Sequence, residues 1–183
     1  MATRARERLL QAAQDLFHAE GIRAVGVDRL LEVSGVGRAS FYRHFATKDD
    51  LVVATVRAYG RHWLARLAET VRTQGDDPLA VFDALAERFA ADDYRGCVSI
   101  NTMVEAADPT SAAHRAAAEH KAELVEYLRG LLVERGHADA EALARHLVLL
   151  VDGAIVTALR ERIARPAHQA KSLAALMLAR DPA

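Results

Sequence analysis

Long stretches of this chain contain no helix-breaking residue, and this feature most constrains its fold. Four prolines and ten glycines are spread over 183 residues, and no run alternates apolar and polar residues as a half-buried strand does. Apolar residues recur instead at helical spacing, as Leu10, Ala13 and Phe17 do. The sequence therefore predicts an all-α fold. The expected helices cover residues 4–20, 27–34, 38–45, 47–73, 78–92, 98–107, 111–135, 140–163 and 167–180.

Composition narrows the class of protein. Half of the residues are hydrophobic (51%), with alanine and leucine leading, as expected for packed helices. The single cysteine, Cys97, excludes an intrachain disulfide and indicates a reducing compartment. The N-terminal residues do not resemble a signal peptide, and His146 and Asp152 interrupt the longest apolar stretch. We therefore expect a soluble, cytoplasmic protein with no membrane partner.

Charge is unevenly distributed along the chain, whose net charge is -1. Residues 1–60 hold nine Arg or Lys against seven Asp or Glu, and residues 61–183 hold 15 against 18. This asymmetry is too mild to indicate a nucleic-acid partner by itself. The local placement of the basic residues has to decide that question.

Two short predicted helices, 27–34 and 38–45, are joined by a turn that contains glycine. This pattern is typical of a helix-turn-helix. Gly35 supplies the end of the first helix. Thr47 and Asp50 form a Thr-x-x-Asp capping box that opens the next, long helix, with Asp where Glu or Gln is usual.

The second short helix carries residues that suit a polyanion. Phe41 and Phe45 are four residues apart and are expected to anchor it on the core. The opposite face combines two small residues with an arginine, which permits close approach to a DNA groove, and flanking side chains can donate to phosphates. The alternative is an ordinary solvated helix face. The predicted DNA-binding residues are Arg38, Ala39, Ser40, Tyr42, Arg43, His44 and Lys48.

The stretch "GIRAVGVDRLLEVSGVGRASFYRHFATKDDLV", residues 21–52, resembles the DNA-binding region of the TetR family of bacterial transcription regulators. That region usually has the form "aGVs...lYrHFpsKeeLl". The matching positions are Gly35, Val36, Tyr42, His44, Phe45, Lys48 and Leu51. The resemblance implies that the predicted DNA-binding residues line the DNA. It also implies an N-terminal three-helix domain joined by a long helix to a larger helical domain.

The same stretch departs from the family pattern in places. Val25 and Gly26 stand where many members have a Thr or Ser that caps the helix and touches phosphate, so that contact is lost or made by a backbone amide. Gly37 replaces a common serine, and Phe41 replaces the commoner leucine. Asp28 brings an acid near the DNA, where it either accepts from a cytosine amine or lies off the groove. We favour the second.

The resemblance further implies a homodimer that reads a near-palindromic operator in double-stranded DNA and binds a small-molecule effector. The expected domains are residues 1–60, with the helix-turn-helix at about 26–45, and residues 61–183 for effector binding and dimerisation. We predict a ligand-responsive regulator, a repressor released from its operator by a small molecule. The alternative is a helical ligand-binding or protein-interaction module that does not bind DNA.

The helix expected at 140–163 is apolar on more than one side. A helix that covers one core needs an apolar stripe only about 100° wide, and Leu149 and Val156 lie outside the main stripe. A partner subunit would cover them; the alternative is burial within a monomer. The predicted dimer-interface residues are Leu149, Val156, Leu173, Leu176 and Met177.

An effector pocket would be lined by large apolar side chains with a few polar ones, which suits a hydrophobic ligand. An apolar residue of this kind is more often part of the ordinary core, and that is the alternative for each apolar candidate. The candidate residues are Trp63, Phe82, Phe89, Asn101, Met103, Glu105, His120, Tyr127 and Asp152.

Catalytic and metal chemistry are not expected. Motifs such as HExxH, CxxC or a glycine-rich phosphate loop do not occur in the sequence. His114 and His120 are six residues apart and point to different helix faces, as do His146 and Asp152. Cys97 is flanked by apolar residues and is expected to be a small hydrophobe rather than a redox sensor. We predict no catalytic residue, no metal ion and no cofactor.

Overall fold

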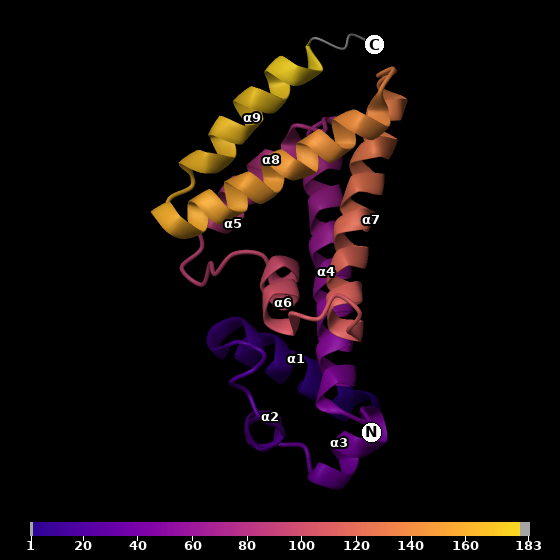
Figure 1. Cartoon of the computed structure of the whole chain (residues 1–183), viewed down its shortest axis with the longest axis vertical. Helices are drawn as coiled ribbons and strands as arrows, with labels where there is room; N and C mark the ends of the chain where they lie inside the picture. The colour runs from indigo at the N-terminus through magenta and orange to yellow at the C-terminus, as the bar shows by residue number, and fades with distance from the viewer. Residues whose placement is uncertain (1, 180–183) are drawn as a thin grey trace. The chain divides into compact units, whose positions relative to one another are not determined.

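A computed structural model describes residues 2–179, which form nine α-helices and no strand (Figure 1). The all-α prediction is confirmed, and every predicted helix is present. The predicted end of the last helix, residue 180, lies outside the described residues. The helices are α1 (Ala2–Glu20), α2 (Val27–Ser34), α3 (Arg38–His44), α4 (Lys48–Thr73), α5 (Ala80–Phe89), α6 (Val98–Ala106), α7 (Ala112–Glu134), α8 (Ala140–Glu161) and α9 (Arg165–Leu178).

The described residues divide into two compact units. The first unit runs to Arg61 and also includes Val98–His120, whereas the second consists of His62–Cys97 and the chain from Lys121 onward. The long helices α4 and α7 each contribute residues to both units. The first unit thus contains the predicted domain 1–60 together with α6 and the beginning of α7. The predicted domain limits stay a prediction.

A small hydrophobic core holds α1, α2 and α3 together in the first unit. It forms because each helix carries apolar residues at helical spacing on one face. Phe41, which the sequence predicts as an anchor, is fully buried there, and Phe45 is 5% exposed. The buried residues of this core are Leu9, Ala13, Leu16, Val25, Leu30, Val36, Phe41, Phe45 and Leu51.

A second cluster in the first unit packs α6 and the first turns of α7 against α4. Val52 and Val56 of α4 contact Ala116 and Ala117 of α7, and Phe17 of α1 packs at the edge of this cluster. The small alanine side chains allow the helices to approach closely. The guanidinium of Arg57 pairs with Glu119 at 3.0 Å across the same contact.

In the second unit, α8 packs against α9, and α5 packs against both. Among the ion pairs that join helices in this unit are Lys171 with Asp83, at 2.6 Å, and Lys121 with Asp152. The four side chains are partly buried. These pairs therefore constrain the relative positions of the helices more strongly than a fully exposed pair would.

The helix α8 is also long and apolar enough to cross a bilayer by length and composition, and it is the one such helix among the described residues. However, 44% of its most apolar 18-residue window is buried against the protein. Buried helices of folded cores meet the same criterion. Length and composition are therefore weak evidence for a membrane span.

Candidate nucleic-acid interface

The turn between α2 and α3 is built from residues with special backbone conformations. Gly35 ends α2 in the left-handed region, with φ 61° and ψ 25°, where side chains with a Cβ are strained. Gly37 then adopts an extended conformation as the N-cap of α3. The N–H of Val36 donates to the Ser34 hydroxyl at 3.3 Å inside the turn. The predicted helix-turn-helix is therefore present.

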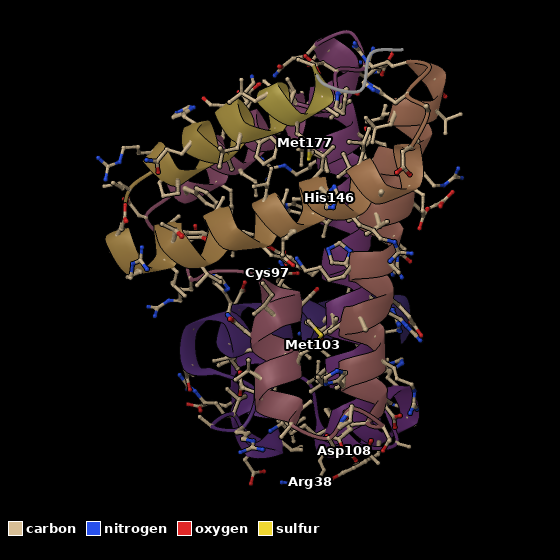
Figure 2. All side chains as sticks on the ribbon, turned by 45° about the horizontal axis from the view of Figure 1, so that its top comes forward. Arg38, Cys97, Met103, Asp108, His146 and Met177 are labelled. Carbon is tan, nitrogen blue, oxygen red and sulfur yellow. The ribbon has the colours of Figure 1, made fainter. Side chains whose placement is uncertain are left out.

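The exposed face of α3 is formed by four of the predicted residues. Arg38, Ala39, Tyr42 and Arg43 are exposed, and Figure 2 shows the Arg38 side chain projecting from the first unit. This face matches the helical spacing of residues i, i+1, i+4 and i+5. The small side chain of Ala39 lies at the centre of this face and is surrounded by longer side chains.

The remaining predicted residues on α3, Ser40 and His44, are only half-exposed and flank this face. Tyr42 belongs to the exposed face, since it is 50% exposed, and its ring stands edge-on to that of Phe41, with the ring centroids 5.1 Å apart. Phe45 is not part of the helix. It ends α3 in an extended conformation while its N–H still donates to the carbonyl of Phe41.

Both short helices begin without a side-chain cap. Gly26 and Gly37 are their N-cap residues, and neither has a side chain that could accept from the first turn. The sequence expectation that Val25 and Gly26 remove a side-chain contact thus agrees with the geometry of α2. Unpaired backbone N–H groups at a helix start favour an anion.

Asp28 on α2 forms an ion pair with Arg38 on α3, at the edge of the exposed face. Asp28 is expected from the sequence to lie off the groove, and the sequence gives no indication of a partner for it. The two residues are ten positions apart and lie on different helices, on either side of the turn. Helical spacing therefore could not predict the pair. Both side chains are largely exposed, which limits the contribution of the pair to stability.

Lys48 lies at the first residue of α4 and is half-buried. Its ammonium donates to the carbonyl of Ile22 at 2.5 Å and lies 6.0 Å from the ring centroid of Phe17. The side chain therefore links α4 to the loop that follows α1. Its phosphate contact stays a prediction, and such a contact has to use the remaining ammonium donors. The capping box is confirmed, since the N–H of Asp50 donates to the Thr47 hydroxyl at 3.1 Å.

Two arginines of α1 lie beside the helix-turn-helix and were not foreseen from the sequence. The Arg6 guanidinium lies 5.5 Å from the ring centroid of Phe45. A guanidinium nitrogen of Arg8 lies near Gly35, 3.6 Å from the position that a Cβ atom at Gly35 would occupy. Both residues are exposed. They add positive charge next to the helix-turn-helix. The sequence does not show this, because it depends on how α1 packs against α2 and α3.

The predicted pocket residues do not form one set. Asn101, Met103, Glu105 and His120 lie in the first unit, and the other five lie in the second. Asn101 and Glu105 line a pocket in the first unit.

The other pocket candidates have packing or pairing roles. Met103 packs against the second cluster of the first unit, between α4, α6 and α7, and His120 is buried beside Gly60. In the second unit, Phe82 and Phe89 are buried in the core, and Asp152 is paired with Lys121. The remaining candidates of that unit, Trp63 and Tyr127, are half-buried.

Four of the five predicted dimer-interface residues are exposed on α8 and α9. Leu149 is 70% exposed and Leu176 65%, and Val156 and Leu173 are also exposed. Met177 is half-buried. Large aliphatic side chains this exposed on two packed helices form an apolar surface in the second unit, which is typical of an association surface.

Comparison with known protein families assigns both parts of the chain. Residues 9–55 match the model of bacterial regulatory proteins of the tetR family. Residues 79–178 match the C-terminal domain of LmrA/YxaF-like transcriptional regulators. The second match covers more than half of the chain.

Individual relatives agree with these matches. The chain is 34% identical over 76 residues to the HTH-type transcriptional regulator TcmR of Streptomyces glaucescens, covering 42% of this chain and 33% of that protein. It is 33% identical over 103 residues to the transcriptional regulator AcuR of Cereibacter sphaeroides, covering 53% of this chain and 47% of that protein. The matches thus span a third to a half of these relatives.

Solved structures extend the likeness to nearly the whole chain. SCO4454, a TetR-family transcriptional regulator from Streptomyces coelicolor, superposes with a TM-score of 0.83 at 31% identity, with 94% of each chain covered. A transcriptional regulator from Rhodococcus sp. Rha1 gives a TM-score of 0.76 at 26% identity, again with 94% of each chain covered.

Proposed function

Since the chain belongs to the TetR family of bacterial transcriptional regulators, we propose that it acts as a homodimeric repressor that a small molecule releases from its operator. The exposed face of α3 carries this proposal. It presents Ala39 between Arg38, Tyr42 and Arg43, so a small side chain meets the groove floor while longer ones reach bases and phosphates. Such a regulator operates in the bacterial cytoplasm, where the DNA is.

A direct test is to select bound fragments from a random pool of double-stranded DNA. A dimer with two α3 helices should recover near-palindromic sequences whose half-sites are centred about 10–10.5 base pairs apart, or a multiple of that. Affinity should fall steeply with salt, because each neutralised phosphate releases counterions. Recovery of no fragment at any salt concentration would instead favour a helical module that does not bind DNA.

Dimerisation is proposed to use the apolar surface of α8 and α9. Leu149 and Val156 on α8 and Leu173 and Leu176 on α9 are exposed large aliphatic residues. In a two-fold interface each of them is buried twice, once from each subunit. Burying an aliphatic side chain of this size contributes about 1.5–3 kcal/mol, so these four residues supply a large part of the association energy.

We predict that replacing Leu149 and Leu176 by glutamate converts the protein to a monomer. Each subunit would lose two buried leucines and place two like charges at the interface, which should weaken the dimer by more than about 100-fold. Sedimentation velocity at micromolar concentration measures the change. The matched control is Val133→Glu on α7, which is 52% exposed and lies outside this surface. A double variant that stays as dimeric as the control would locate the interface elsewhere.

The pair between Asp28 and Arg38 is proposed to restrain binding to random DNA. An exposed pair adds little to stability, but the carboxylate neutralises an arginine that could otherwise reach a phosphate. We predict that Asp28→Asn strengthens binding to random DNA and steepens the slope of log affinity against log salt by about 0.9 per subunit. Thermal unfolding should hardly change.

The control for Asp28→Asn is Glu32→Gln. Glu32 is also an exposed acid of α2, but it pairs with Arg29 on the same helix at 2.9 Å. Both variants remove one negative charge from α2. Equal effects would show that net charge, rather than release of Arg38, strengthens the binding.

A further inference from the structure

The first unit contains a pocket between α1, α4 and α6, three helices that meet within this unit (Figure 1). The space inside it amounts to about 410 Å³ only when the open solvent at its mouth is counted, so the enclosed part is small and a bound molecule would extend into the mouth. Its apolar wall includes Phe17 of α1, Ile22 of the following loop, Val56 of α4 and Val98 of α6. The pocket lies in the same compact unit as the helix-turn-helix.

A buried hydroxyl in the wall of this pocket lacks a hydrogen-bond partner. Thr102 on α6 is 1% exposed, and its Oγ1 has no partner among the described residues. Thr55, another wall residue, shows the usual solution: its hydroxyl donates to the carbonyl of Leu51, one turn earlier, at 2.8 Å. Leaving a buried hydroxyl unpaired is unfavourable. The Thr102 hydroxyl therefore keeps an unused donor beside the pocket, although its oxygen is buried in the wall.

The pocket wall is also connected to the loop that leads into α2. Glu105 lines the pocket, and its Oε2 accepts the backbone N–H of Arg23 at 2.9 Å. Ile22 contributes its side chain to the wall, while its carbonyl accepts the Lys48 ammonium. A molecule in the pocket would thus contact Ile22 of the loop between α1 and α2 and Glu105, the side chain that holds the backbone of this loop. Because this loop leads directly into α2, its displacement would move the start of α2.

We propose that this pocket is the effector site and that it takes a small, uncharged, mainly apolar molecule carrying one oxygen atom, which accepts a hydrogen bond from the Thr102 hydroxyl. The apolar wall favours the body of such a molecule. An anion would face the Glu105 carboxylate, and a cation would compete with the Arg23 N–H for it. The inference rests on the proposed ligand response, and it locates that response in the unit that carries α3.

Binding can be followed at the δ1 methyl groups of the four isoleucines in the chain, Ile22, Ile100, Ile155 and Ile163. The probes are benzyl alcohol and acetophenone, which carry an oxygen acceptor, and toluene, which does not. We expect the oxygen-bearing probes to shift the Ile22 methyl signal while Ile155 and Ile163, in the second unit, stay unchanged. Shifts at Ile155 instead, or no shift with any probe, would overturn the assignment.

The Thr102→Val variant removes the hydroxyl but keeps the shape of the side chain. It should weaken the oxygen-bearing probes about three- to tenfold, with little effect on toluene. It should also raise the melting temperature of the ligand-free protein by about 2–4 °C, because an unpaired buried hydroxyl is removed. The control, Thr55→Val, breaks a formed hydrogen bond and should not raise it. Unchanged probe affinity in Thr102→Val would contradict the role of the hydroxyl.

The regulatory part is tested with the selected DNA. An oxygen-bearing probe that shifts Ile22 should lower the DNA affinity of the wild type more than that of Thr102→Val. A probe that binds at Ile22 without changing DNA affinity would overturn the effector role. The two proposals fail separately: absence of DNA binding refutes the repressor, whereas the methyl shifts report on the pocket whether or not DNA is bound.

Discussion

Replacing Phe41 by alanine is expected to destabilise the helix-turn-helix by about 3–5 kcal/mol. Phe41 is fully buried in the core shared by α1, α2 and α3, and its ring lies 6.2 Å from that of Phe45. Its removal leaves a cavity in a small core that cannot easily collapse. Whole domains are stable by only about 5–15 kcal/mol, so the loss should abolish DNA binding. Urea unfolding and fragment retardation measure the two effects.

The matched control for Phe41→Ala is Tyr42→Ala, one residue further along α3. Tyr42 is 50% exposed, so its truncation should lower stability by no more than about 1.5 kcal/mol, the worth of its edge-on contact with Phe41. This variant should stay folded and lose affinity only through missing DNA contacts. Equal destabilisation by both substitutions would contradict the role of Phe41 as the anchor of α3.

Replacing Arg43 by alanine is expected to reduce discrimination between operator and random DNA by about 1–3 kcal/mol per subunit, the worth of a bidentate contact to a base edge. Arg43 is exposed on α3 and has no carboxylate partner among the described residues, whereas Arg38 is held by Asp28. Competition between selected and random fragments measures the change.

Two comparison variants separate the possible causes. Lys48→Ala should weaken operator and random DNA alike, since a phosphate contact carries no sequence information. Arg66→Ala removes an exposed arginine from α4 in the second unit and should leave both affinities unchanged. Loss of discrimination from Lys48→Ala as large as from Arg43→Ala would show that base and phosphate contacts are wrongly divided between these residues.

The parts of the fold that were predictable depend on neighbouring residues. α2 begins and ends at the predicted residues because Gly35 allows the left-handed turn that stops it. The start of α4 was foreseen because Thr47 and Asp50 are three residues apart and cap each other. The burial of Phe41 and the exposure of Arg43 follow from helical spacing alone.

The contacts that were missed join residues distant in sequence. Glu105 accepts from the N–H of Arg23, 82 positions away, and Lys48 reaches Ile22, 26 positions away. Asn101 and Glu105 were foreseen as pocket residues, but Thr102 between them was not. A threonine in a helix normally pairs with its own backbone, so its unpaired hydroxyl is visible only once its neighbours are placed.

Local signals in the sequence specify the helices, the helix-turn-helix and the face of α3 that points away from the core. Glycine turns, caps and apolar spacing act over a few residues, so they can be interpreted without knowing what packs nearby. The tertiary structure decided which acid neutralises Arg38, which carbonyl holds Lys48, and where α1, α4 and α6 leave a pocket. Those features arise from packing between distant segments, where many weak contacts together select one arrangement.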